Sequence, residues 1–313
     1  MEQIRIGNSD MVVSRMGVGT MAWSNSKRWG YGADLGRQDV EAAYKVSAAN
    51  GPILFDSAEI YGFGQSERIL GALIQGDQKP LYMATKYAPM PWRFNRRSVI
   101  KAIDKSRDRL GVKQIDLYQV HFPGGWLKIE ALMNALADAV EAGKIRHIGV
   151  SNYSANQMNR AQSALANRGL SLVSNQVEYS LINREVEFNN VFERCRELGV
   201  TLIAYSPLGR GILSGKYSPG KSTPDMRRYY GQFKDKKLAS FRPLIDALRE
   251  IGQAHEDKSP AQVSLNWLAR QPGILPIPGA KNEQQAQDNA AAISWQMSEE
   301  EASQLSQISA SLT

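Results

Sequence analysis

The chain has 313 residues, of which 42% are hydrophobic and 22% charged, and its formal net charge is +7. Such a chain can bury a large core without disulfides, and its single cysteine, Cys195, excludes an internal disulfide. No basic segment followed by an apolar stretch opens the sequence, and no apolar run is long enough to span a membrane. We therefore expect a soluble protein without membrane partners, in the cytoplasm, or in a plastid if a transit peptide was removed.

The positive charge is spread along the chain, apart from Arg227–Arg228 and the stretch Lys234–Lys237. No known nucleic-acid-binding pattern accompanies it, so we expect no nucleic-acid partner. A mild attraction for anions, including phosphorylated cofactors, is the simpler interpretation. The sequence does not predict an oligomeric state.

Short apolar, β-branched runs alternate with amphipathic segments along the whole chain. The runs that predict strands are Met16–Thr20, Ile53–Asp56, Tyr82–Lys86, Ile115–His121, Ile145–Val150, Leu172–Gln176, Thr201–Tyr205 and Ile274–Ile277. The segments that predict helices are Gln38–Ala49, Ser98–Leu110 with Ser98 as its N-cap, Ile129–Ala142, Ser154–Leu165, Val186–Leu198, Pro243–His255 and Pro260–Ala269. With no break in composition, this alternation predicts an α/β fold, a (β/α)8 TIM barrel that forms a single domain over residues 1–313.

A doubly wound parallel sheet is the alternative fold, and it would usually place a Gly-x-Gly-x-x-Gly turn after its first strand. Gly17-Val18-Gly19 begins that pattern, but position 22 is Ala, so the barrel is favoured. Two additions to the barrel are expected. Arg5–Val13 predicts an N-terminal β-hairpin that caps one end of it, and about Gly209–Lys237 forms a long loop after the seventh strand.

Ionisable side chains stand at the ends of three successive predicted strands, namely Asp56, Lys86 and His121, and Tyr61 follows in the loop after Asp56. The carboxyl ends of barrel strands are where active sites are built. A phenol has a pKa of about 10, and a buried ammonium such as Lys86 would lower it. With Asp56 holding Lys86 and His121 facing a carbonyl oxygen, the four side chains predict a site that delivers a proton to an oxygen becoming an alkoxide.

No side chain donates hydride, so such a site needs a cofactor as reductant. Hydroxyl and amide groups that match a nicotinamide carboxamide, and a ring that would stack on it, are found at Ser151, Asn152, Gln176 and Tyr205. Ser206–Gly211 would present backbone N–H groups to a pyrophosphate. Lys281 precedes a helix predicted to begin near Glu283, a position suited to a 2′-phosphate.

These residues lie in motifs that resemble those of the aldo-keto reductase superfamily. The matching stretches are Phe55–Gly62, Gln65–Glu67, Ala84–Lys86, Gly149–Asn152, Ser174–Tyr179, Tyr205–Leu208, Leu213–Tyr217 and Ile277–Lys281. They cover nearly the whole chain in order. Within the superfamily the chain resembles the branch of plant and cyanobacterial reductases and potassium-channel β subunits. Ser57 departs from the Thr that is common in this motif, and Asn50–Ile53 differs from the usual entry to the second strand.

The resemblance implies reduction of aldehydes and ketones with NADPH/NADP+ as cofactor. It assigns the catalytic tetrad to Asp56, Tyr61, Lys86 and His121. It assigns cofactor contacts to Thr20, Met21, Asp56, Ser151, Asn152, Gln176, Tyr205, Ser206, Pro207, Leu208, Gly209, Gly211, Ser214, Lys216, Gly279, Lys281, Gln285 and Asn289. Arg227 or Arg228 either reaches over the cofactor or is exposed to solvent, and the sequence leaves both interpretations open.

The substrate is expected to be a small carbonyl compound in an apolar pocket. The side chains predicted to line that pocket are Trp23, Tyr61, Tyr87, Trp92, His121 and Trp126. No spacing of His, Cys, Asp and Glu predicts a metal site. Small aldehydes, aromatic aldehydes, pyridoxal and methylglyoxal all remain open as substrates.

Two other functions compete with carbonyl reduction. Lys86 would form a Schiff base in a barrel aldolase, but that function leaves Gly149–Asn152 and Gly279–Lys281 without a use. A cofactor-sensing regulatory subunit, like the channel β subunits, would keep the tetrad and act mainly by binding a partner. Steady-state NADPH consumption over a panel of aldehydes distinguishes this alternative from an enzyme.

Overall fold

The fold is built around one parallel sheet of eight strands in the order β10-β9-β8-β7-β6-β5-β4-β3. A computed structural model describes residues 2–24, 35–77, 79–221, 227 and 229–312. The strands are β3 (Val18–Gly19), β4 (Ile53–Asp56), β5 (Leu81–Tyr87), β6 (Ile115–Val120), β7 (Ile145–Ser151), β8 (Leu172–Glu178), β9 (Thr201–Tyr205) and β10 (Ile274–Pro276). The backbone N–H groups of Gly17 and Gly19 donate to the carbonyls of Pro276 (2.9 Å) and Pro278 (3.0 Å), which joins the first strand to the last. This closure confirms the (β/α)8 barrel and excludes the doubly wound sheet.

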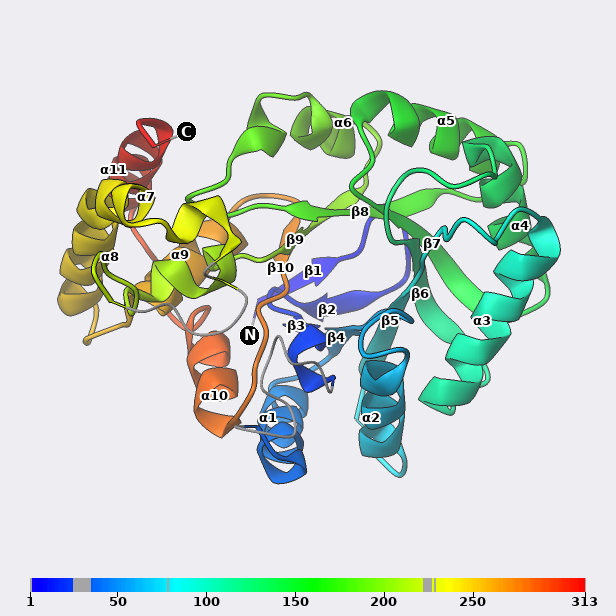
Figure 1. The fold of residues 1–313 in the computed structure, drawn as a ribbon, viewed down its shortest axis with the longest axis horizontal. Helices are drawn as coiled ribbons and strands as arrows, with labels where there is room; N and C mark the ends of the chain where they lie inside the picture. The colour runs from blue at the N-terminus through cyan, green and yellow to red at the C-terminus, as the bar shows by residue number, and fades with distance from the viewer. Residues whose placement is uncertain (1, 25–34, 78, 222–226, 228, 313) are drawn as a thin grey trace.

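Helices surround the strands on the outside, as Figure 1 shows. The α-helices are α1 (Arg37–Ala49), α2 (Gln65–Ile74), α3 (Arg96–Leu110), α4 (Ile129–Glu141), α5 (Ala155–Ala166), α6 (Val191–Glu197), α7 (Asp235–Ser240), α8 (Arg242–Ala254), α9 (Pro260–Ala269), α10 (Glu283–Ala291) and α11 (Glu299–Ala310). The 3-10 helices are η1 (Met21–Trp23), η2 (Glu185–Glu187), η3 (Gly209–Ser214) and η5 (Gly231–Phe233). Within the described residues, every helix is too short or too polar to cross a membrane.

The predicted helices needed three corrections. The segment Val186–Leu198 is not one helix but η2 followed by α6, because Asn190 adopts a left-handed conformation (φ 65°) between them. The N-cap of α3 is Asn95 rather than Ser98, since the Asn95 side chain accepts a hydrogen bond from the Ser98 N–H at 3.0 Å. Helices α2, α7 and α11 were not predicted at all, and the first residues of α7 fall in the predicted loop of about Gly209–Lys237.

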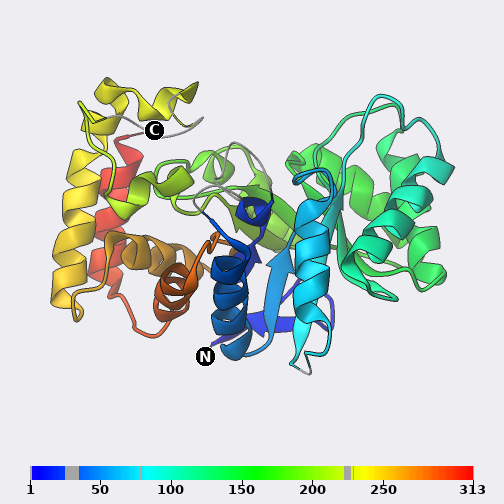
Figure 2. The same cartoon turned by 60° about the horizontal axis from the view of Figure 1, so that its bottom comes forward.

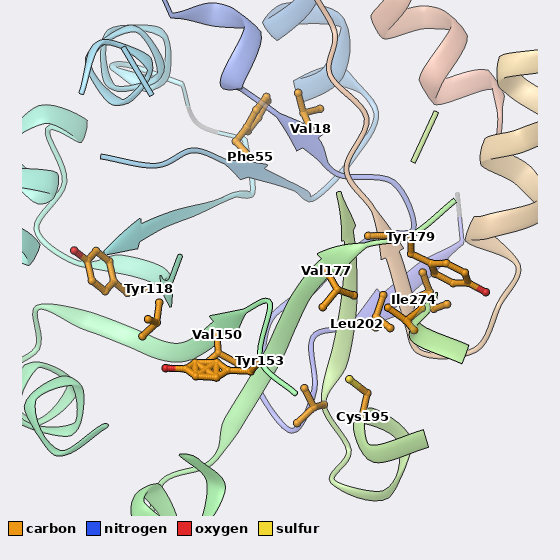
Figure 3. Packing of buried hydrophobic residues seen from close by; sticks show 14 of the residues in the cluster. Val18, Phe55, Tyr118, Val150, Tyr153, Val177, Tyr179, Cys195, Leu202 and Ile274 are labelled. Atoms are coloured by element: carbon orange, nitrogen blue, oxygen red, sulfur yellow. The ribbon is translucent and has the colours of Figure 1, made fainter. Parts of the chain in front are cut away.

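The core has two layers, which follow from the alternation of side chains along each strand. Residues such as Phe55 and Tyr118 point outward and pack against the helices; Figure 3 shows several members of this outer cluster. Their neighbours Leu54 and Leu117 belong instead to the inner cluster that fills the barrel.

An N-terminal hairpin of β1 (Gln3–Arg5) and β2 (Val12–Ser14) closes one end of the barrel. Ile6, Met11 and Val13 are fully buried in the inner cluster with strand residues. In Figure 2 the hairpin lies at the lower end of the barrel, while the yellow helix α7 after β9 lies at the upper end. The predicted hairpin cap and the long connection after the seventh barrel strand are both confirmed.

Candidate active site

Three strands bring the predicted tetrad together at the carboxyl end of the barrel. Asp56 is the last residue of β4, Lys86 lies near the end of β5, and His121 directly follows β6. Leu54 lies two residues before Asp56 and belongs to the inner cluster, so strand alternation points Asp56 into the barrel. Tyr61 approaches from the loop after β4.

Lys86 is the centre of this group. Its Nζ donates to Asp56 Oδ2 at 2.5 Å, to the Ser57 carbonyl at 2.7 Å and to Tyr61 Oη at 3.5 Å. Lys86 and Asp56 are both buried. An ammonium has three protons, and these three acceptors use all of them. The side chain is therefore held in one position beside the phenol.

The electrostatics of the phenol differ from the expectation based on Lys86 alone. The low-dielectric surroundings of Tyr61 raise its pKa above the ordinary value, and the nearby Lys86 only partly offsets that increase. The prediction of a lowered pKa was therefore wrong for this structure. For Lys86, burial alone would lower the pKa, but Asp56 and Tyr61 raise it above its ordinary value. At neutral pH the site thus holds a neutral phenol beside an ammonium.

His121 faces Tyr61, with the two rings edge to face and their centroids 5.7 Å apart. Desolvation and the charge of Lys86 lower the pKa of His121 to about 3. Its Nδ1 is buried and has no hydrogen-bond partner among the described residues. The imidazole is therefore neutral at physiological pH, and it can act as a hydrogen-bond donor through one ring nitrogen.

Asp56 has two hydrogen-bond partners besides Lys86, and the sequence interpretation named only one of them as a site residue. Its Oδ1 accepts from Gln176 Nε2 and from Gln119 Nε2, each at 2.9 Å. Gln176 was predicted as a cofactor contact, whereas Gln119 was missed. The alternation of side chains along a strand would have predicted that Gln119 points into the barrel, because Gln119 lies two residues before His121 and two after the inward-facing Leu117.

The residues predicted to contact nicotinamide lie beside the tetrad. Asn152 is exposed, has a left-handed backbone (φ 58°), and its side chain bridges two neighbours. Its Oδ1 accepts from Tyr205 Oη at 3.1 Å, and its Nδ2 donates to Ser151 Oγ at 3.1 Å. Ser151 Oγ in turn donates to the Gln176 carbonyl at 2.8 Å. The structure therefore joins the side chains of Ser151, Asn152 and Tyr205, and links them to the backbone of Gln176 at the ends of β7, β8 and β9.

The loop after β9 has an unusual backbone. Ser206, Gly209, Arg210 and Gly211 have φ values of 50°, 54°, 55° and 98°. Such conformations are costly for non-glycine residues and cluster at ligand sites. The Arg210 guanidinium binds both oxygens of Glu178 at 2.7 and 3.0 Å, which holds the loop against the end of β8.

Other predicted cofactor residues follow β9 and β10. Ser214 Oγ donates to the Gly211 carbonyl at 2.7 Å, and Pro207, unlike its neighbours Ser206 and Leu208, is buried. Lys216 is exposed, with its Nζ 5.2 Å from the centre of the Tyr217 ring. Arg227 donates to Tyr217 Oη at 2.6 Å, and Arg228 lies outside the described residues.

The third predicted group surrounds the start of α10. The Lys281 N–H donates to Gln285 Oε1 at 3.0 Å, and Asn289 Nδ2 donates to the Gly279 carbonyl at 3.3 Å. Gly279 forms a parallel bridge with Gly19. Thr20, which follows Gly19, is buried, while Met21 is partly exposed. The predicted helix start near Glu283 is confirmed.

The predicted aromatic pocket needs correction at two positions. Trp23 is 0% exposed, packs against Phe55 and donates its indole N–H to the Ala280 carbonyl at 2.7 Å. Tyr87 is 1% exposed, because the residue after the inward-facing Lys86 must point toward the helices. Neither side chain has surface left for a substrate to contact.

Trp92 and Trp126 behave differently from Trp23 and Tyr87. They are 65% and 71% exposed, on the loops after β5 and β6. These two loops pack together, since a Cβ placed on Gly125 would lie 2.9 Å from Pro89 Cβ. Both tryptophans therefore lie on neighbouring loops, which form the rim of the barrel end that carries the tetrad.

An ion pair that the sequence interpretation missed ties this rim to the tetrad. The Arg93 guanidinium contacts both carboxylate oxygens of Glu59, and the Ala88 N–H donates to Glu59 Oε1 at 2.7 Å. Glu59 lies two residues before Tyr61, and Arg93 directly follows Trp92. The loop with the phenol and the loop with the tryptophan are therefore joined.

Comparison with known proteins identifies relatives of the whole chain. The model of the Aldo/keto reductase family matches residues 15–310. A protein of Arabidopsis thaliana named pyridoxal reductase, chloroplastic, is 36% identical over 97% of this chain and 85% of its own length. An aldo-keto reductase of Schizosaccharomyces pombe, named for NADP(+), is 36% identical over 83% of this chain and 79% of its own length.

Solved structures agree with these matches. The glycerol dehydrogenase of Gluconobacter oxydans superposes with a TM-score of 0.85 at 26% identity, covering 98% of this chain and 94% of that one. An aldo/keto reductase of Klebsiella pneumoniae, solved with NADP and acetate, has a TM-score of 0.75 at 26% identity, covering 97% and 94%.

Proposed function

The chain belongs to the Aldo/keto reductase family of oxidoreductases, and we propose that it reduces aldehydes or ketones to alcohols with NADPH. In this proposal Tyr61 donates the proton. The observation that carries the proposal is the chain of contacts from Asp56 through Lys86 to Tyr61 Oη. It places a neutral phenol next to a fixed positive charge, at the end of the barrel where the polar side chains converge.

NADPH supplies the hydride when it is bound. The protein's part is to hold the carbonyl and deliver the proton. As the carbonyl oxygen gains negative charge, the ammonium of Lys86 stabilises the phenolate left on Tyr61. His121, neutral because its pKa is lowered to about 3, can donate a hydrogen bond to the same oxygen and orient it.

The residues present suit a nicotinamide dinucleotide. The exposed amide of Asn152, held by Ser151 and Tyr205, offers donor and acceptor groups for a carboxamide. The loop from Ser206 to Gly211, in which Ser206, Gly209, Arg210 and Gly211 are left-handed, would present N–H groups to a pyrophosphate. Lys281 at the start of α10 would bind a 2′-phosphate, which favours NADPH over NADH.

For the substrate we propose a carbonyl compound with a flat, partly apolar body, held by Trp92 and Trp126. Pyridoxal is the first compound to test, since the Arabidopsis relative is named for it. The cytoplasm remains the proposed location beside a plastid, and imaging a fluorescent fusion of the full gene product distinguishes the two.

The Schiff-base alternative is disfavoured by the state of Lys86. A Schiff base needs a neutral amine, whereas burial against Asp56 and Tyr61 leaves Lys86 with a raised pKa and three hydrogen-bond acceptors. The regulatory alternative predicts very slow turnover with every carbonyl and co-purification of a membrane protein.

The experiment is a screen of NADPH and NADH oxidation by the purified protein. The panel contains pyridoxal, aromatic aldehydes, small aliphatic aldehydes and methylglyoxal. We expect carbonyl-dependent oxidation of NADPH that exceeds that of NADH. An absence of turnover with the whole panel, while NADPH still binds, would overturn the proposal.

A further inference from the structure

Gln119 occupies an unusual position for a polar residue with no assigned role. It lies in β6 and is 0% exposed. On the same face, Leu117 belongs to the apolar cluster inside the barrel and His121 to the tetrad. A leucine or methionine of similar size would fill this space without needing any hydrogen-bond partner.

Its side-chain amide completes a triangle of hydrogen bonds. Gln119 Nε2 donates to Asp56 Oδ1 at 2.9 Å, and Gln119 Oε1 accepts from Gln176 Nε2 at 3.2 Å. Gln176 Nε2 also donates to Asp56 Oδ1 at 2.9 Å. Because an ionised carboxylate only accepts, this arrangement defines which end of the Gln119 amide faces Asp56.

The two oxygens of the Asp56 carboxylate have different hydrogen-bond partners. The two amides occupy Oδ1, and Lys86 occupies Oδ2 at 2.5 Å. Rotation of the carboxylate away from Lys86 would therefore break both amide contacts in a buried setting, where an unpaired polar group is costly. Gln119 also joins Asp56 to Gln176, and so connects the proton-delivery side of the site to the proposed nicotinamide side.

We propose that Gln119 is a positioning residue for the reduction. It holds Asp56 in the orientation that fixes Lys86 beside Tyr61, and it holds the side-chain amide of Gln176 against Asp56. This inference rests on the proposed function. Gln119 does not touch the reacting atoms, and it acts through Asp56 and Gln176.

Two variants test the proposal. Gln119→Met keeps the length of the side chain but cannot donate or accept as an amide does, and we expect kcat to fall about ten-fold or more. The KM for the carbonyl should change by less than about three-fold. The kcat is expressed per mole of NADPH-binding sites, because unfolded protein would also lower a kcat that is expressed per mole of total protein.

Gln119→Glu gives a readout that a merely structural role would not produce. Protonated, the new side chain has one O–H donor for Asp56 Oδ1 and one carbonyl acceptor for Gln176, as the amide has. Ionised, it places a second negative charge against Asp56. The kcat of this variant should therefore approach that of the unmodified protein at acidic pH and fall as pH rises, whereas the Gln119→Met loss should not depend on pH.

Thr201→Val is the matched control. Thr201 is also buried, but its hydroxyl binds the Gly7 N–H and the Arg5 carbonyl at the hairpin end of the barrel. We expect lower stability with unchanged kcat. A Gln119→Met protein with full kcat, or a Gln119→Glu pH profile parallel to that of the unmodified protein, would overturn the inference. Failure of the unmodified protein to reduce any carbonyl would instead overturn the proposed function.

Discussion

At the scale of single residues, the chemistry depends on how burial and charge compete around Tyr61. The sequence placed Lys86 beside the phenol correctly, but it did not show that burial would outweigh the ammonium and raise the pKa of Tyr61. The raised value suits reduction, because the proton is then present on the phenol throughout the neutral range. Proton transfer becomes favourable only when charge develops on the carbonyl oxygen.

The first prediction concerns pH. Tyr61 must be protonated to donate, so activity should be lost only as pH rises through its raised pKa, above the ordinary value of about 10. His121, with its pKa lowered to about 3, should contribute no step near neutral pH. We therefore expect kcat/KM for carbonyl reduction to stay level from mildly acidic to mildly alkaline pH. A rise or fall of the measured kcat/KM near neutral pH would contradict this prediction.

The second prediction concerns the buried ion pair of Lys86 and Asp56. Lys86→Met leaves the Asp56 carboxylate without its ammonium, which should lower the free energy of unfolding by about 3 kcal/mol. Adding Asp56→Asn should recover much of that loss without restoring turnover. Urea unfolding followed by circular dichroism measures the first effect, and NADPH oxidation the second. Equal stability of the single and double variants would show that the pair is not coupled.

At the scale of elements, the strand pattern was predictable and the loops were not. Ile53–Asp56 and Thr201–Tyr205 were predicted with their observed bounds, because short β-branched runs between polar residues mark buried parallel strands. Trp23 and Tyr87 were misplaced because an aromatic residue near a strand end looks the same whether it faces the pocket or the helices. Alternation from Lys86 would have placed Tyr87 correctly and would have revealed Gln119.

The third prediction concerns the ion pair between the β4 and β5 loops. Arg93→Met should raise the KM for a bulky carbonyl several-fold and lower kcat, because Trp92 and Tyr61 lose their common anchor at Glu59. Arg93→Lys keeps the charge but not the two-point contact, so its effect should be smaller and of the same sign. Steady-state kinetics measures both variants. NADPH affinity, determined by fluorescence titration, should be unchanged, and unaltered kinetics in Arg93→Met would rule out the anchor.

At the scale of the whole molecule, the two ends of the barrel have separate tasks. The closed ring and the hairpin plug followed from the sequence because they depend on repeated patterns over many residues. The identity of the substrate did not, because it depends on loop side chains such as Trp92 and Trp126 whose directions no periodic pattern sets. The family resemblance predicts the reaction at the carboxyl end of the barrel, but it does not predict the shape of the loops that surround the substrate.

The fourth prediction tests this separation. Met11→Ala removes a fully buried side chain from the hairpin plug and should lower the free energy of unfolding by about 2 to 5 kcal/mol. Because the hairpin lies at the opposite end from the tetrad, kcat of the folded protein should stay close to that of the unmodified protein. Denaturant unfolding and NADPH oxidation below the transition measure the two quantities. A large fall in kcat would mean that the two ends are coupled.

The central claim is that Tyr61 delivers the proton in NADPH-dependent carbonyl reduction, and Tyr61→Phe tests it most directly. This change removes one oxygen atom and leaves the ring, Lys86 and the proposed cofactor residues in place. We expect turnover of the best carbonyl from the screen to fall at least about a hundred-fold while the Kd of NADPH stays the same. Turnover by purified Tyr61→Phe at the rate of the unmodified protein would contradict the account.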